Sequence, residues 1–156
     1  MKNIILFLCF LVLSFSTVAQ YQGQYRLQYG HDFGLGSGLT GVNFVGEYFP
    51  IDNISFAPSF SILLPASGKA SQLHIDGRYY FQEEAVQLYG LIGYANFRRR
   101  LEFDFDDPLY HRGSLNIGGG ILYKLMDELG LNGELKFQPQ NNGEFIIKIG
   151  MSYFIN

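Results

Sequence analysis

Residues 24–35 read QYRLQYGHDFGL, a stretch in which apolar and polar side chains alternate. The apolar row is interrupted once, by His31. Because successive side chains of a β-strand point to opposite faces, this pattern predicts a strand with one apolar and one polar face. The apolar row comprises Tyr25, Leu27, Tyr29, Phe33 and Leu35, and the polar row comprises Gln24, Arg26, Gln28, Gly30, Asp32 and Gly34.

The same period of two recurs along the rest of the chain, between turn signals rich in Gly, Pro, Asn and acidic residues. The further segments are Thr40–Phe49, Ile54–Leu64, Ser71–Phe81, Val86–Phe97, Ser114–Leu125, Leu129–Phe137 and Phe145–Ile155. The segment 86–97 is apolar on both faces, which leaves its register open. Each segment is close to the roughly 9–11 residues that a tilted membrane strand needs. We therefore predict an all-β fold, an eight-stranded antiparallel up-and-down transmembrane β-barrel.

The composition agrees with such a barrel and excludes several other classes of protein. The 156 residues include 11 Lys and Arg against 14 Asp and Glu, a net charge of −3 that argues against nucleic-acid binding. The 19 Gly and the 17% of aromatic residues, none of them Trp, are typical of turn-rich β-structure and exclude a disordered chain. Only 16% of the residues are charged, a low proportion for a soluble surface.

The first 19 residues have the pattern of a secretory signal peptide. Lys2 precedes an apolar stretch over residues 4–15, and small residues follow up to Ala19. That stretch is too short for a membrane anchor, so we expect cleavage, with residues 20–156 forming the exported barrel domain. Cys9 is the only cysteine and would leave with the leader, so the exported chain would hold no disulfide.

The placement of charge indicates which face of the barrel meets lipid. In seven of the eight segments the apolar row holds no Lys, Arg, Asp or Glu. The second, fourth and sixth connections are tight turns, as expected on the periplasmic side. Near these turns lie aromatic residues that predict a girdle at the membrane interface: Tyr25, Tyr48, Phe49, Tyr79, Phe81, Tyr89, Tyr123 and Tyr153. We therefore expect an integral protein of the cell outer membrane, with a soluble periplasmic ligand-binding barrel as an alternative.

The polar row would fill the lumen with a nearly balanced set of charges. An eight-stranded barrel has an interior that side chains can fill, and buried charges need partners. We therefore predict a largely plugged lumen with a charge network of Arg26, Asp32, Glu47, Asp76, Arg78, Lys124, Glu134, Lys136 and Lys148. A narrow small-solute pore is the alternative, favoured by the small inward residues Ser55, Ala57, Ser59, Gly118 and Gly120.

Four stretches also resemble a known family. They are residues 73–81 (LHIDGRYYF), 88–94 (LYGLIGY), 115–124 (LNIGGGILYK) and 150–154 (GMSYF). Together they are similar to the small outer-membrane β-barrel proteins of Gram-negative bacteria that are often grouped as the porin family. The resemblance covers the mature chain and implies an outer-membrane barrel that the barrel-assembly machinery inserts, with a last strand that ends near an aromatic residue. It carries no catalytic motif.

We expect neither an enzyme nor a metal or cofactor site. Some eight-stranded outer-membrane barrels process lipid A with Ser, His and an acidic residue, but His31, His74 and His111 do not form the lipid-facing His-x-Ser pair of the deacylase type. The acidic residues at 104, 106 and 107 lack the glycine and the bidentate Glu of a calcium loop. The sequence thus predicts a structural or surface-interaction role.

The connection from Arg98 to Gly113 is the segment that predicts partners. Arg98, Arg99 and Arg100 would stand at the outer rim, where lipid A presents phosphates that guanidinium groups bind well, so they are candidates for contact with outer-membrane lipid and lipopolysaccharide. A solvated basic rim is the alternative. The alternating residues Leu101, Phe103 and Phe105 are candidates for an edge that pairs with a protein partner.

Overall fold

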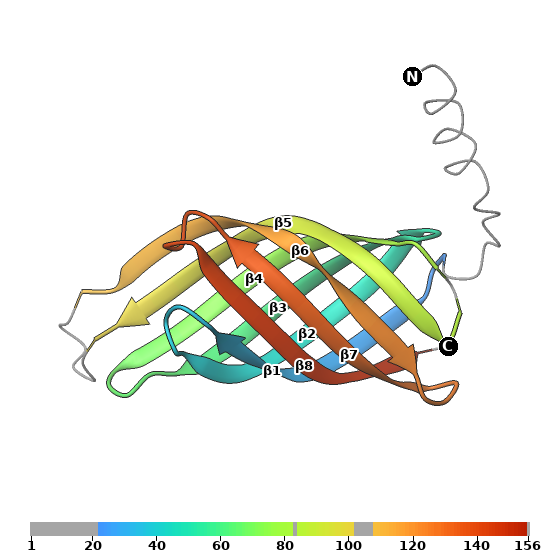
Figure 1. Cartoon of the computed structure of the whole chain (residues 1–156), viewed down its shortest axis with the longest axis horizontal. Coiled ribbons are helices and arrows are strands. Elements are labelled where there is room, and N and C mark those ends of the chain that lie inside the picture. Colours follow the sequence, from blue (N-terminus) through green and yellow to red (C-terminus); the bar gives the residue numbers. More distant parts are fainter. Residues whose placement is uncertain (1–21, 83, 102–107, 156) are drawn as a thin grey trace, which may run out of the picture.

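Eight antiparallel strands close on themselves in a computed structural model, which describes residues 22–82, 84–101 and 108–155 (Figure 1). Each strand pairs with its neighbours in sequence, and the first pairs with the last, so the chain is an up-and-down barrel. The fold class predicted from the sequence is confirmed. The strands are β1 (Tyr25–Gly34), β2 (Thr40–Ile51), β3 (Ile54–Leu64), β4 (Lys69–Tyr80), β5 (Val86–Arg100), β6 (Tyr110–Lys124), β7 (Leu129–Gln138) and β8 (Glu144–Ile155).

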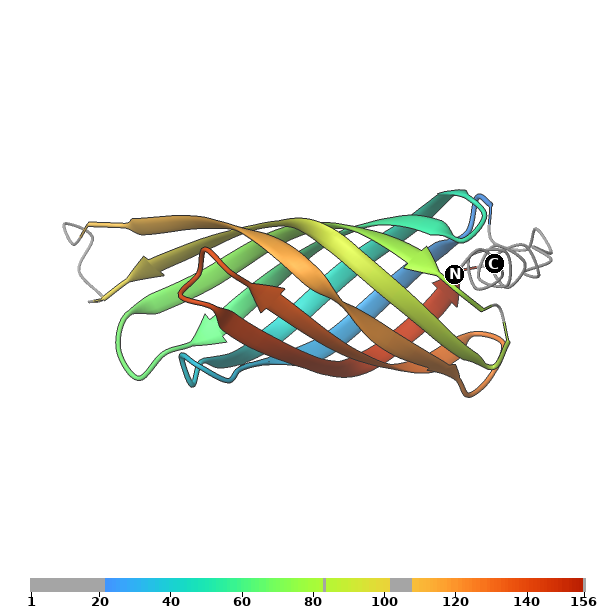
Figure 2. The same ribbon diagram turned by 45° about the horizontal axis from the view of Figure 1, so that its top comes forward.

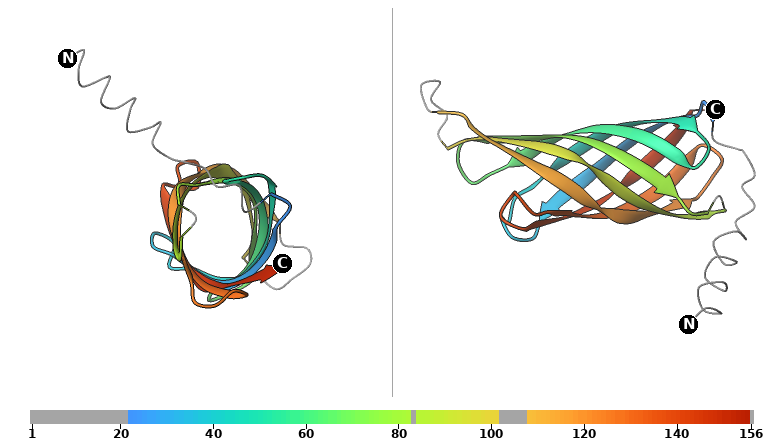
Figure 3. Two further views of the ribbon diagram at one scale, coloured as in Figure 1. Left: turned by 90° about the vertical axis from the view of Figure 1, so that its right-hand side faces the viewer. Right: turned by 90° about the horizontal axis from the view of Figure 1, so that it is seen from above.

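Seen from one end, the strands form a ring (Figure 3). The alternation in the sequence corresponds to alternating exposed and buried residues, which lie outside and inside this ring. On β1, Leu27 and Tyr29 are about half exposed, whereas Arg26 and Gln28 are buried. The same division holds on the other strands, so large apolar side chains cover the outside and polar ones fill the inside. Among the described residues, no helix is long and apolar enough to cross a membrane.

The two ends of the barrel differ (Figures 1 and 2). We call the end with connections 52–53, 81–85 and 125–128 the short-turn end. The first strand, β1, begins at this end, and the last strand, β8, ends there. The other end, the long-loop end, carries the β5 and β6 extensions, which project beyond the neighbouring strands. The β3–β4 connection at that end is only 65–68, because β4 begins at Lys69, earlier than the sequence predicted.

The register of β5, which the sequence left open, is set by its pairing with β4 and β6. Leu88, Ile92 and Tyr94 are exposed on the outside, whereas Tyr89 and Leu91 are buried inside. For two residues, the prediction that they belong to the outer aromatic girdle is wrong. Phe49 and Tyr89 point into the lumen, because each follows a residue that already occupies the outer face.

Candidate functional site in the lumen

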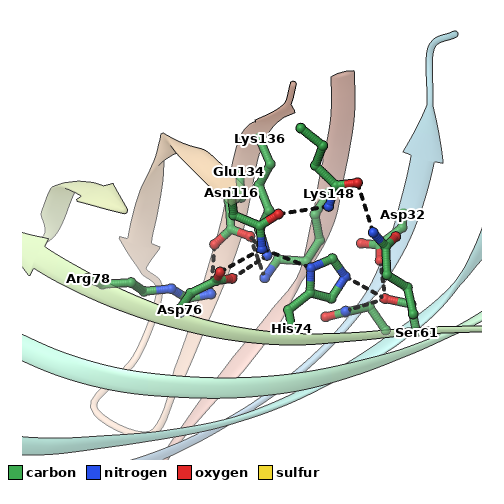
Figure 4. Close-up of polar contacts among 12 residues, drawn as sticks. Asp32, Ser61, His74, Asp76, Arg78, Asn116, Glu134, Lys136 and Lys148 are labelled. Carbon is green, nitrogen blue, oxygen red and sulfur yellow. Dashed lines mark hydrogen bonds and ion pairs between the residues drawn. The ribbon is translucent and has the colours of Figure 1, made fainter. Parts of the chain in front are cut away.

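Glu134 of β7 is the centre of a buried ion-pair network (Figure 4). Its Oε2 lies 2.7 Å from Arg78 Nη2 of β4, on a strand that is not a neighbour of β7, so this pair bridges the lumen. Its Oε1 lies 3.0 Å from Lys136 Nζ and 3.1 Å from Lys148 Nζ. All four side chains are buried, so each charge depends on its partners in place of water.

Two further carboxylates complete this network on either side of Glu134. Asp76 Oδ2 lies 2.6 Å from Lys136 Nζ, and Asp76 Oδ1 accepts a hydrogen bond of 2.7 Å from Asn116. Glu47 Oε1 lies 3.3 Å from Arg78 Nη1. The same carboxylate accepts hydrogen bonds from neutral donors, namely Gln28, Ser55 and Tyr80. Asp76 and Glu47 therefore each have both an opposite charge and neutral donors, as a stable buried network requires.

An aromatic cluster lies inside the barrel at the short-turn end. It consists of Phe49, Tyr80, Tyr89, Leu91, Leu122 and Phe154, which are all buried. The Arg26 guanidinium lies over three of these rings, 4.3 Å from the centroid of Phe49, 4.9 Å from Phe154 and 5.1 Å from Tyr80. Its Nη1 also donates to Gln87 at 3.2 Å. A desolvated cation over several rings is a favourable arrangement, so these rings help to stabilise the buried arginine.

The lumen also contains a Ser–His pair, Ser61 and His74. The direction of its hydrogen bonds does not suit activation of the serine as a nucleophile. Asn116 Oδ1 accepts from Gln138, so its Nδ2 faces Asp76 and, at 3.1 Å, His74 Nδ1. Nδ1 must therefore accept, which places the proton on Nε2, the nitrogen 3.5 Å from Ser61 Oγ. Ser61 donates its own proton to Asp32. His74 is thus not oriented to act as a base toward Ser61.

The structure places eight of the nine residues predicted for the lumen network in buried positions inside the barrel. Lys124 is the one placed apart from them. It lies half-buried at the short-turn end, with Nζ 3.8 Å from Asp127 Oδ1 and 5.5 Å from the centroid of Phe154. Glu144, which was not among the predicted residues, is buried and accepts hydrogen bonds from the backbone of Gly36 and Ser37. The outward position of Phe145 was the signal that Glu144 points inward.

The three rim arginines do not share one face. Arg98 is exposed, and strand alternation puts Arg100 on the same outer row, directly opposite Lys69 of β4. His111 of β6 lies opposite Arg98 and is also exposed. Arg99, in contrast, lines a cavity at the long-loop end of the lumen. The basic outer row therefore consists of Lys69, Arg98 and Arg100, and His111, opposite Arg98, also borders the cavity.

The predicted partner edge is described only in part. Phe103 and Phe105, like the acidic residues at 104, 106 and 107, lie outside the described residues. Leu101 lines the cavity, and its carbonyl accepts a hydrogen bond of 3.2 Å from Ser67. Within the described residues, no group of three or more His, Cys, Asp or Glu side chains could hold a metal ion.

Comparison with known proteins identifies the architecture. No family model and no curated protein matches the sequence. Among solved structures, the chain is similar to the N-terminal β-barrel domain of Pseudomonas aeruginosa OprF, with a TM-score of 0.74 and 18% identity over 87% of this chain and 100% of that one. It is also similar to Ail, the attachment invasion locus protein of Yersinia pestis (TM-score 0.64, 16% identity, 86% and 99% covered).

A third similar structure is the outer membrane protein OprG from Pseudomonas aeruginosa, with a TM-score of 0.64 and 14% identity over 88% of this chain and 98% of that one. At such low identities these similarities establish the fold alone. This chain has the eight-stranded architecture found in small outer-membrane barrels, as the sequence resemblance implied.

Proposed function

We propose that this protein is an integral outer-membrane β-barrel with a structural or surface-interaction role, no enzymatic activity and a lumen closed by its own side chains. The observation that carries this proposal is the division between an apolar outside and an inside that holds the buried polar and charged side chains of the barrel. A soluble monomer rarely exposes an apolar surface of more than a few hundred Å², whereas here it surrounds the barrel. A lipid bilayer provides the solvent that such a surface requires.

Closure of the lumen is supported by two layers of side chains. The Arg78–Glu134 pair bridges the ring between β4 and β7, and the aromatic cluster fills the short-turn end. Two of the small inward residues already have other atoms close to the position of a side chain. A side chain at Gly120 would collide with the ring of Tyr89, and one at Gly118 with the backbone of Leu135.

The absence of enzymatic activity is supported by the lumenal polarity described above, because His74 is not oriented as a base toward Ser61. A surface-interaction role is supported by the basic outer row. If the short turns face the periplasm, this row stands beside the outer leaflet, where lipid A presents phosphates. Guanidinium and ammonium groups attract such anions, so lipopolysaccharide is the partner that we propose for this row. Insertion by the barrel-assembly machinery follows from the same membrane placement.

Membrane fractionation tests the location of the protein. We expect the mature chain in the outer-membrane fraction, extractable only with detergent, and with a gel mobility that changes on heating as the barrel unfolds. A chain that stays soluble without detergent would instead support a periplasmic ligand-binding barrel.

Single-channel recording tests the closed lumen. The mature chain, reconstituted in a planar bilayer, should show no stable open state. As a positive control, the variant Arg78→Ser/Glu134→Ser removes the cross-lumen pair and should increase the frequency of open events. Stable conductance steps from the unmodified chain would favour the small-solute pore over the closed barrel.

A further inference from the structure

The lumen is not filled at the long-loop end, where the described residues enclose a cavity of about 480 Å³. This volume is within the range of small-molecule sites. One part of its wall is apolar and comes from Leu39, Leu63, Phe97, Leu101 and Ile146, which lie on four different strands or their adjoining connections. The cavity is therefore a built feature of the barrel, lined from several sides at once.

The other part of the wall carries two arginines. Arg99 of β5 pairs with Tyr110 of β6, and Arg112 of β6 pairs with Phe97 of β5, so the two cations are diagonal neighbours on the inner face. Arg112 Nη1 donates to Asn142 Oδ1 at 2.6 Å on the exposed rim. Arg99 Nε is buried and has no hydrogen-bond partner among the described residues. A buried unpaired donor of a cation is costly, and an anion in the cavity would satisfy it.

The charge balance also favours an anion. Asp32, at the base of the cavity, stands opposite Lys148 of β8 and accepts from Ser61, so it belongs to the buried network. Below the cavity, the buried lumenal cations and carboxylates are equal in number: Arg26, Arg78, Lys136 and Lys148 against Asp32, Glu47, Asp76 and Glu134. Above these groups, the described lining residues include Arg99 and Arg112 against Glu144 alone, whose carboxylate is already held by two backbone donors.

We infer that this cavity binds an amphipathic monoanion, a carboxylate or similar head group on a short apolar tail, with the head group at Arg99 and Arg112 and the tail against Leu39, Leu63 and Ile146. The two halves of the wall match the two halves of such a molecule. Binding at this site is independent of ion conduction and of the basic outer row, because Arg99 faces inward while Arg98 and Arg100 face outward.

The test uses the folded barrel in lipid nanodiscs and three probes: decanoate, decanol and acetate. Decanol has the tail without the charge, and acetate has the charge without the tail. We expect saturable binding of one decanoate per barrel, at least tenfold tighter than decanol, with no saturation by acetate. The Nε–Hε resonance of Arg99 should shift with decanoate. Empty nanodiscs measure the partition of each probe into lipid.

Two variants and a matched control locate the site. Arg99→Gln should weaken decanoate binding at least tenfold, and Leu39→Gln should weaken it by reducing the apolar wall. Arg98→Gln removes the neighbouring cation from the outer face and should leave binding unchanged. Heat-modifiable mobility verifies that each variant is folded. Equal binding of decanoate and decanol, or unchanged binding in Arg99→Gln, would overturn the inference and leave the proposed membrane barrel untouched.

Discussion

The two ends of the lumen each hold an inward arginine, and the two arginines have opposite surroundings. Arg26, at the short-turn end, is fully buried beneath the rings of Phe49 and Phe154 and donates to Gln87. Arg99, at the long-loop end, lines an open cavity and has a buried Nε without a hydrogen-bond partner in the described part of the chain. Both arginines lie on the inner face of the barrel. Arg26 is enclosed by rings, whereas Arg99 borders a cavity that a ligand could enter.

The difference lies in the size of the neighbouring side chains and in the length of the strands. At the short-turn end, aromatic residues from β2, β4, β5 and β8 converge within the ring. At the long-loop end, β5 and β6 extend beyond their neighbours, so fewer strands supply side chains to the same cross-section. A barrel with one polar inner row can therefore pack a buried aromatic cluster at one end and keep a cavity at the other.

The largest effect should come from the network between the two ends. Glu134→Gln removes the charge shared by Arg78, Lys136 and Lys148 and leaves buried cations without their partner. Breaking a buried pair on one side costs about 3–5 kcal/mol, so urea unfolding in lipid vesicles should show a loss of that size. Asp127→Asn, at the exposed pair with Lys124, is the control and should change stability little. Equal stabilities of the two variants would contradict the role of the network.

The second effect should come from the aromatic cluster at the short-turn end. Phe154→Ala removes a buried ring that packs in the aromatic cluster and lies 4.9 Å from the Arg26 guanidinium. The resulting void should cost about 3 kcal/mol in the free energy of unfolding. Ile155→Ala changes the next residue, whose side chain points outward, where lipid can fill the space. A smaller loss for Phe154→Ala than for Ile155→Ala would show that the cluster does not hold this end together.

These residues also show how far the sequence could predict the structure. Period-two alternation predicted the number of strands, the fold class and, outside the segment 86–97, the face of most residues, because a barrel with one apolar side requires one register. It did not place Phe49, Tyr89 and Phe154 in a common cluster, since residues on β2, β5 and β8 converge only after the ring has closed.

The ion pairs and the cavity were beyond the sequence for a related reason. Alternation predicts that Glu134 and Arg78 both point inward, but the stagger of the strands decides which inward charges lie at the same height. Similarly, three consecutive arginines suggest one basic rim. Only the extension of β5 to Arg100 shows that the middle one, Arg99, faces the cavity. Contacts across the lumen depend on the closed geometry, which no local pattern encodes.

A direct comparison of the two arginines gives the third prediction. Arg26→Met keeps most of the side-chain volume but removes the cation from beneath three rings, and should cost about 2 kcal/mol in the free energy of unfolding. Arg99→Met should leave the unfolding free energy nearly unchanged, because the side chain is half-buried at an open rim. In decanoate binding the order should reverse, with Arg99→Met weakened and Arg26→Met unaffected. Unfolding and decanoate binding, both measured on each variant, distinguish an arginine that stabilises the barrel from one that binds a ligand.

The smallest effect should come from the outer face of the same rim. A cation near an anionic membrane surface contributes about 1 kcal/mol, so Arg98→Gln should reduce lipopolysaccharide association by roughly fivefold without changing the unfolding of the barrel. Addition of Arg100→Gln should reduce it further, because that residue shares the outer row with Arg98 and Lys69. Arg99→Gln is the matched control, since it removes an equal charge from the adjacent position but on the inner face.

The amount of lipopolysaccharide retained through purification measures the association. If all three variants lose it equally, net charge at the rim decides the association; if only those on the outer row lose it, the face of the strand decides, as we expect. If none of them loses it, the basic outer row is a solvated rim and lipopolysaccharide is not its partner.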